Sequence, residues 1–279
     1  MLWQIEHSTE FTYPAPVHDS FNEARLRPFS NEQQKVESFA LQVTPDTRVR
    51  EYRDFYLNTV HQFEVPEPHT TLSITSRLRV ATNSPAGLAR DARPAPMAAL
   101  KEAARIGRCY DFLQSSRYVD TEPDIWRLAI DAANGENDVW QCALRLMAFV
   151  NGHITYESES TRVHTHAREV LEQKRGVCQD MAHVLIGLCR SLRIPALYVS
   201  GYLATEKASA SHAWTEVFVP GAGWQALDAT HNRQPDETYI KIAVGRDYGD
   251  VAPIKGVYKG TTDHTMKVTV KIQPAAAKS

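Results

Sequence analysis

The sequence predicts an α+β protein whose N-terminal domain is rich in β-strands, and three observations carry this prediction. Apolar and polar residues alternate over much of residues 1–82, which is the two-residue period of antiparallel strands. From about residue 124 onward, apolar residues recur three and four apart, the period of amphipathic helices. Strand-like runs then return after Pro195.

The first of these regions is predicted to form a β-sandwich-like module that ends at a linker. Proline, glycine, asparagine and serine concentrate in residues 83–96, where the strand-like pattern gives way to a helix-like one. We place the boundary near residue 90, which gives a β-rich domain at residues 1–90 and a second domain at residues 91–279.

Composition and charge exclude several classes of function. The chain has 279 residues and a formal net charge of −2, without a run of like charges, so neither a nucleic acid nor a membrane surface is an expected partner. Its first residues lack the basic start and unbroken apolar stretch of a secretory signal, so we expect a cytoplasmic protein. The four cysteines show no zinc-ligand spacing, and we expect free thiols with no metal and no cofactor.

In the second domain, apolar spacing predicts helices around residues 124–130 and 139–147, and a further helix that starts at Cys178. Met181, Leu185 and Cys189 form the apolar stripe of this last helix. Alternating runs after it predict strands at residues 197–203, 213–219, 224–228, 239–244 and 266–272.

Cys178 differs from an ordinary buried cysteine by its position. A helix N-terminus favours a thiolate through its partial positive charge and unpaired N–H groups, and the thiolate is the nucleophilic form. Gly176 is expected to let the chain turn tightly into the helix. A lone cysteine is more often a small buried hydrophobe, so the functional interpretation depends on its neighbours.

Those neighbours are predicted on a hairpin. Residues 211–219 and 224–228 are strand-like and flank a turn at residues 220–223. If Val219 pairs with Gly223 across a three-residue loop, His212 lies diagonal to Asp228 on one face, within reach of a hydrogen bond. Cys178, His212 and Asp228 then form a catalytic triad of nucleophile, general base and orienting carboxylate.

Several segments resemble the transglutaminase-like superfamily. They are residues 176–183 (GVCQDMAH), 198–202 (YVSGY), 211–214 (SHAW) and 223–230 (GWQALDAT). The order Cys, His, Asp agrees with that family, and residues 244–258 resemble its bacterial subgroup, in which a β-rich region precedes the core. Ala229, where the family usually has proline, and Leu57, where it tends to have glycine, depart from the pattern.

The resemblance implies a papain-like core, with the helix that starts at the cysteine packed on an antiparallel sheet. It also implies that Cys178 forms a thioester with an acyl group from an amide, so the expected partner is a peptide or protein with an amide acyl donor. The leading hypothesis is a cysteine peptidase or amidase, with acyl transfer to an amine as a close variant. The sequence does not fix the oligomeric state.

Two other interpretations stay open at this level. The fold could serve as a catalytically silent peptide-binding module, and a thiol-ligated metal could use His183 and His212, although the ligand spacing does not favour it. Supporting roles are conceivable for some residues outside the triad, but a structural role is the simpler interpretation for them: Tyr156, His183, Trp214, Trp224, Tyr248 and Asp250.

Overall fold

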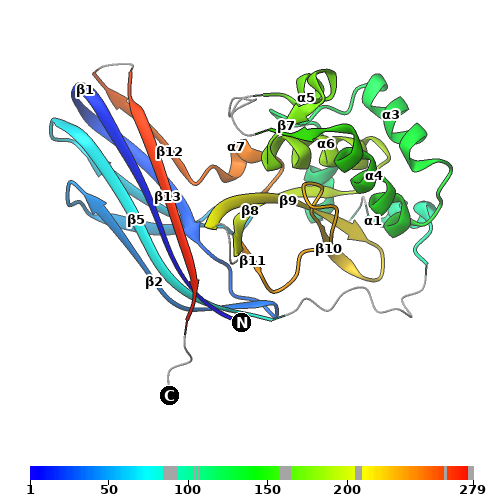
Figure 1. Ribbon diagram of the computed structural model, residues 1–279, viewed down its shortest axis with the longest axis horizontal. Helices are drawn as coiled ribbons and strands as arrows, with labels where there is room; N and C mark the ends of the chain where they lie inside the picture. The colour runs from blue at the N-terminus through cyan, green and yellow to red at the C-terminus, as the bar shows by residue number, and fades with distance from the viewer. Residues whose placement is uncertain are drawn as a thin grey trace.

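The computed structural model confirms the predicted α+β class. It describes residues 1–83, 94–103, 105, 107–157, 165–204, 209–260 and 263–275. Figure 1 shows two parts, a β module made of long strands and a core in which helices cover a smaller sheet. Among the described residues, no helix has the length and apolar character needed to cross a bilayer.

The β module is a seven-stranded antiparallel sheet that bends into a half-barrel around one long strand. That strand, β1, pairs through its first half with β5 and β13 and through its second half with β4 and β12. Alternate side chains fill the interior because strand residues point to opposite faces. The strands are β1 (Leu2–Arg27), β2 (Gln34–Thr44), β3 (Val49–Arg53), β4 (Thr59–Val65), β5 (His69–Thr82), β12 (Ile254–Lys259) and β13 (Thr265–Pro274).

The C-terminal strands therefore return to the β module. The predicted strand at residues 266–272 exists as β13, but its partner is β1 rather than the core sheet. The proposed division at residue 90 stays a prediction, because residues 84–93 of the linker lie outside the described residues. Any division of this chain has to assign both of its ends to one sheet.

The core sheet has the strand order β10-β9-β8-β11. Its strands are β8 (Ala196–Ala204), β9 (Ser209–Val219), β10 (Gly223–Leu227) and β11 (Tyr239–Gly245), and a small parallel pair joins β6 (Thr155–Tyr156) to β7 (Arg175–Gly176). The helices are α1 (Leu100–Ala103), α2 (Gly107–Tyr110), α3 (Pro123–Ala133), α4 (Val139–His153), α5 (Ala167–Gln173), α6 (Cys178–Ser191) and α7 (Tyr248–Val251), with 3-10 turns η1 (Met97–Ala99) and η2 (Asp111–Leu113).

Helix α6 lies at the centre of the core, and it starts at the predicted residue. Every residue from Asp180 to Arg190 is buried, because α3, α4 and α5 pack around the helix and β9 packs beneath it. The side chain of Thr215 on β9 donates to the carbonyl of Ala182, at 3.4 Å. This packing sets where the start of α6 lies relative to β9.

The edge strand β11 of the core sheet meets the β module. The Asn58 side chain bonds both backbone groups of Val244, each at 2.8 Å, and Gln34 does the same for Lys241 at 2.7 and 2.8 Å. A cluster of apolar side chains, including Phe112 and Trp214, fills the sheet face there. The β module thus holds the edge strand β11 in place.

Candidate active site

The nucleophile candidate, Cys178, is the first residue of α6. Asp180 stabilises this helix start because its Oδ2 accepts the N–H of Val177 at 2.8 Å. Gly176 is required for another reason than the predicted tight turn: a Cβ atom there would lie only 2.8 Å from the Cβ of Asp180. The close approach of Gly176 and Asp180 therefore positions the sulfur.

Exposure separates Cys178 from the other three cysteines. Cys178 is partly exposed, whereas Cys109, Cys142 and Cys189 are buried. Burial raises the pKa of the Cys142 thiol to about 11 and that of Cys189 well above its ordinary value. The buried thiols are held in the protonated, unreactive form.

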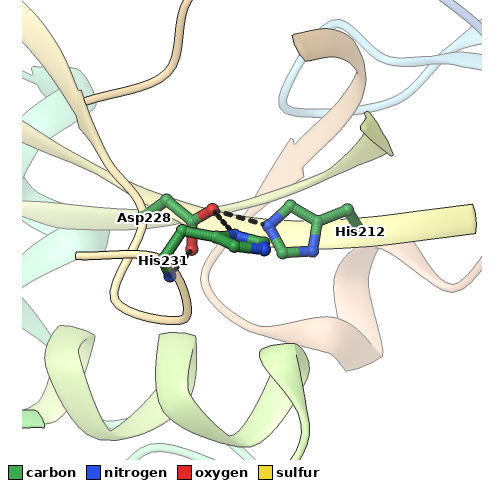
Figure 2. A group of neighbouring side chains, drawn as sticks. All are labelled: His212, Asp228 and His231. Carbon is green, nitrogen blue, oxygen red and sulfur yellow. Dashed lines mark hydrogen bonds and ion pairs between the residues drawn. The ribbon is translucent and has the colours of Figure 1, made fainter. Parts of the chain in front are cut away.

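The hairpin has the predicted register. Val219 pairs with Gly223, and Thr215 pairs with Leu227. His212 and Asp228 thereby meet, with Nε2 of His212 2.8 Å from Oδ2 of Asp228 (Figure 2). His212 is 8% exposed and Asp228 is fully buried, so water competes little with this hydrogen bond.

Cys178 lies close enough to His212 to act on the pKa of its imidazole. Because Nε2 of His212 faces Asp228, the nitrogen left for the thiol is Nδ1. Burial acts to lower the pKa of His212, but hydrogen bonds to Asp228 and Cys178 and the charges of both raise it to about 9. The arrangement therefore favours an imidazolium beside Cys178.

Asp228 carries more hydrogen bonds than the predicted triad requires. Its Oδ2 also accepts from Nδ1 of His231 and from the hydroxyl of Tyr239, each at 2.7 Å. Its Oδ1 accepts the N–H of Thr230 at 2.8 Å. Burial acts to raise the pKa of Asp228, but His212 and the other donors hold it well below its usual range. Asp228 is thus a permanent anion.

Sequence reasoning missed both His231 and Tyr239. His231 follows Asp228 by three residues, a spacing that could have marked it as a second partner of the carboxylate. Tyr239 gave no local signal, because it reaches Asp228 from β11, which lies at the opposite edge of the core sheet from β10.

The secondary candidates lie in different places. His183 is fully buried, and its Nε2 accepts the N–H of Tyr248 at 3.1 Å, while burial lowers the pKa of the ring to about 3. Trp214 stacks beside His212, with ring centroids 6.3 Å apart, and Asp250 binds Arg246. Trp224 packs edge-on against Phe112 and Phe218, with ring centroids 5.3 and 5.6 Å apart.

Tyr156 is the exception among them. Its side chain is 55% exposed, and its pKa is raised first by partial burial and then by the negative charge of Cys178. Its backbone on β6 pairs with Gly176, two residues before the cysteine. Tyr156 therefore lies near the sulfur, where a hydroxyl could meet a substrate.

The geometry around Asp228 is that of hydrogen bonding. The ligand-type atoms of His212, Asp228 and His231 lie within 4.8 Å of one another, close enough to surround a metal ion. However, two ligands of a tetrahedral zinc ion lie roughly 3.3 Å apart, given bonds of about 2.0 Å. The separations of 2.7 and 2.8 Å are shorter than this and match donor–acceptor contacts. A metal-free site stays a prediction.

Two hollows lie beside the core sheet, with volumes of about 280 and 980 Å³. Both are lined by Glu216, Trp224 and Lys241, and the smaller one also by Tyr239. Cys178 and His212 line neither hollow. These hollows are therefore separate from the sulfur.

Together, these features define a class of protein: an α+β core in which a helix begins at a cysteine and packs on an antiparallel sheet that carries a His–Asp pair. Residues 127–229 match the model of the transglutaminase-like superfamily, and residues 3–81 match the bacterial transglutaminase-like N-terminal region. The chain belongs to the transglutaminase-like superfamily, in the group with this N-terminal region.

Similar proteins extend over the whole chain. The uncharacterized protein ML0607 of Mycobacterium leprae is 34% identical, over 97% of this chain and 99% of its own. The uncharacterized protein Rv2569c of Mycobacterium tuberculosis is 31% identical, over 98% and 92%. A crystal structure of a candidate cysteine protease from Cytophaga hutchinsonii has a TM-score of 0.82 at 24% identity, covering 100% of this chain and 92% of that one. The last likeness establishes a shared fold.

Proposed function

We propose that this protein is a cysteine-nucleophile hydrolase of amide or peptide bonds that acts through a thioester. The observation that carries the proposal is the chain of contacts from Asp228 through His212 to Cys178 at the start of α6. A buried anion, a polarised imidazole and a partly exposed thiol in this order are the parts that acyl transfer needs.

The proposed first step forms the thioester. Sγ of Cys178 attacks the carbonyl carbon of the substrate, and N–H groups of the first turn of α6 stabilise the negative charge that develops on oxygen. His212 donates the proton on Nδ1 to the leaving nitrogen, and the carbon–nitrogen bond breaks. An amine or ammonia departs, and the acyl group stays on sulfur.

Water completes the proposed cycle. His212 now takes a proton from water through Nδ1, and the oxygen attacks the thioester carbon while the carbon–sulfur bond breaks. A carboxylic acid leaves, and the thiolate–imidazolium pair is restored. A primary amine in place of water would give a new amide by the same route, which is the transfer variant.

Peptide turnover with and without an amine tests this proposal. A glutamine-containing peptide library is incubated with the protein, with and without a primary amine, and is followed by mass spectrometry. We expect cleaved or deamidated peptides in the presence and in the absence of the amine. An amine adduct is expected only if transfer competes with hydrolysis. The Cys178→Ala protein should leave every peptide unchanged.

A product formed equally by wild type and Cys178→Ala would contradict the mechanism. Peptide binding without turnover by a folded wild-type protein would instead support a catalytically silent binding module. Iodoacetamide adds a readout independent of substrate: rapid and selective alkylation of Cys178 that is lost in His212→Ala is expected of a working pair.

A further inference from the structure

The carboxylate of Asp228 is shared by two imidazole rings. His212 approaches Oδ2 from β9, and His231 approaches the same atom from the turn that follows β10 (Figure 2). The ring centroids of the two histidines are 5.3 Å apart. Tyr239 on β11 is the third donor to this oxygen. Three separate segments therefore converge on one atom of the proposed relay.

The hydrogen bonds fix where the protons lie. An ionised carboxylate only accepts, so His212 carries a proton on Nε2 and His231 carries one on Nδ1. The hydroxyl of Tyr239 donates to Asp228 and accepts from Nε of Arg233 at 2.9 Å. Because Nε2 of His212 is protonated, its Nδ1 is free to serve Cys178. The donors thus select the tautomer that the proposed mechanism requires.

The turn after β10 has its own supports, so it does not depend on the His231 ring. Oδ1 of Asp228 accepts the N–H of Thr230, and the Asn151 side chain donates to the carbonyls of Ala229 and Thr230 at 2.9 and 3.1 Å. A backbone pair between Asp228 and Arg233 closes the turn, with N···O distances of 2.9 and 3.2 Å. These contacts hold the backbone and leave the ring to act on Oδ2.

We infer that His231 is a positioning residue that keeps Oδ2 of Asp228 directed at Nε2 of His212. This inference rests on the proposed function and deepens it. The side chain of His231 is 43% exposed and that of Asp228 is fully buried, so the ring lies between the carboxylate and solvent. Without the ring, water reaches Oδ2 and competes with His212 for its lone pairs.

The charged and titratable groups around the two histidines come from several elements. Cys178 on α6 contacts His212, and Tyr239 on β11 contacts Asp228. Arg233, in the turn, bonds Tyr239 and pairs with Asp236 at 3.6 Å. If the Asp228 carboxylate is less well ordered, its hydrogen bond to His212 stabilises the imidazolium less. The cysteine is not changed by this.

The pKa of His212, measured by NMR titration, tests the inference without reference to turnover. In His231→Ala we expect this pKa to fall by at least about half a unit, because the Asp228 hydrogen bond is made for less of the time. His231→Asn should restore most of the wild-type value, since the amide of Asn places an N–H near the position of Nδ1. Thermal unfolding of both variants checks that the fold is kept.

A turnover measurement gives a second test of the positioning role of His231. If the proposed function holds, His231→Ala lowers kcat about tenfold with KM changed less than about twofold, since positioning acts on the chemical step. His18→Ala is the matched control. The His18 side chain is 48% exposed, and its Nδ1 lies 3.3 Å from Asp19, on strand β1 of the β module and not on the core sheet that carries His212. It should leave kcat and the pKa of His212 unchanged.

The outcomes separate the two proposals. An unchanged pKa of His212 in a folded His231→Ala protein overturns the positioning role, whether or not the protein is active. An equal fall in pKa in His231→Ala and His231→Asn overturns it as well, because an N–H donor would then not be what matters. A wild-type protein without turnover, in which the pKa still responds to His231, overturns the proposed function alone.

Discussion

The two ends of helix α6 each carry a cysteine, and the helix treats them in opposite ways. At its start, Cys178 is partly exposed and contacts an imidazole. At its end, Cys189 is fully buried, and burial raises the pKa of its thiol well above the ordinary value. The residue type is the same, and the helix is the same. The difference in exposure and contacts therefore comes from position along the helix and not from residue type.

The charged groups at the two ends differ in the same way. At the start, Asp180 bonds a backbone N–H and leaves the sulfur open. At the end, Arg190 is 1% exposed and donates to the carbonyls of Ala196, Gln114 and Arg246. One end leaves a thiol partly exposed, and the other buries a charge that holds neighbouring segments to the helix.

The largest expected effect is the loss of kcat in Cys178→Ala. Cys178→Ala should lower kcat by about ten-thousand-fold or more, because no other group takes the role of the nucleophile. Its free energy of unfolding should change by less than about 1 kcal/mol, since the side chain is partly exposed. Peptide turnover and urea unfolding measure the two quantities.

Cys189→Ala makes the same substitution at the other end of α6, and the opposite effects are expected. It should keep kcat within about twofold and lower the free energy of unfolding by about 1–2 kcal/mol, through loss of buried contacts. Substantial activity in Cys178→Ala, or a large loss of kcat in a folded Cys189→Ala protein, would remove the distinction between the two ends.

The sequence identified the start of α6 better than its end. Helical spacing after Cys178 was enough to predict the helix start, because it depends on local periodicity. The register of the hairpin was predicted only on the condition that Val219 pairs with Gly223, and the structure shows this pairing. The pairing of β12 and β13 with β1 could not be predicted this way. Alternation indicates a strand but says nothing about which distant strand it joins.

Long-range polar contacts were equally hard to see. Arg190 is followed by Ser191 near the end of the predicted helix, and an arginine in that setting is usually solvated. Its carbonyl partners come from three other segments, so only the fold shows that it is buried and satisfied. Tyr239 was missed beside Asp228 for the same reason.

Removing the Arg190 charge tests the stability role of the helix end. Arg190→Met should lower the free energy of unfolding by about 3 kcal/mol, because several buried carbonyls lose their donor. Arg190→Lys should recover only part of this loss, since an ammonium cannot reproduce the planar set of donors. Urea unfolding gives both values, and near-wild-type stability of Arg190→Met would show that water replaces the guanidinium.

The last expected effect is a decrease of kcat/KM at high pH, and it tests the distinction between the two ends of α6. The pKa of His212 in the folded chain is about 9, above its ordinary value of 6.5. Its imidazolium therefore stabilises the fold fully below about pH 6.5, and this contribution is lost as the pH rises through about 9. In the proposed mechanism His212 donates a proton to the leaving nitrogen, so kcat/KM should fall about tenfold per unit above pH 9. The same decrease of kcat/KM above pH 9 is expected for Cys189→Ala, because the changed side chain lies at the other end of α6. A decrease of kcat/KM that begins near pH 6.5 in either protein would mean that Asp228 and Cys178 do not hold the proton on His212. The two ends of the helix would then not differ in the way that the proposed mechanism requires.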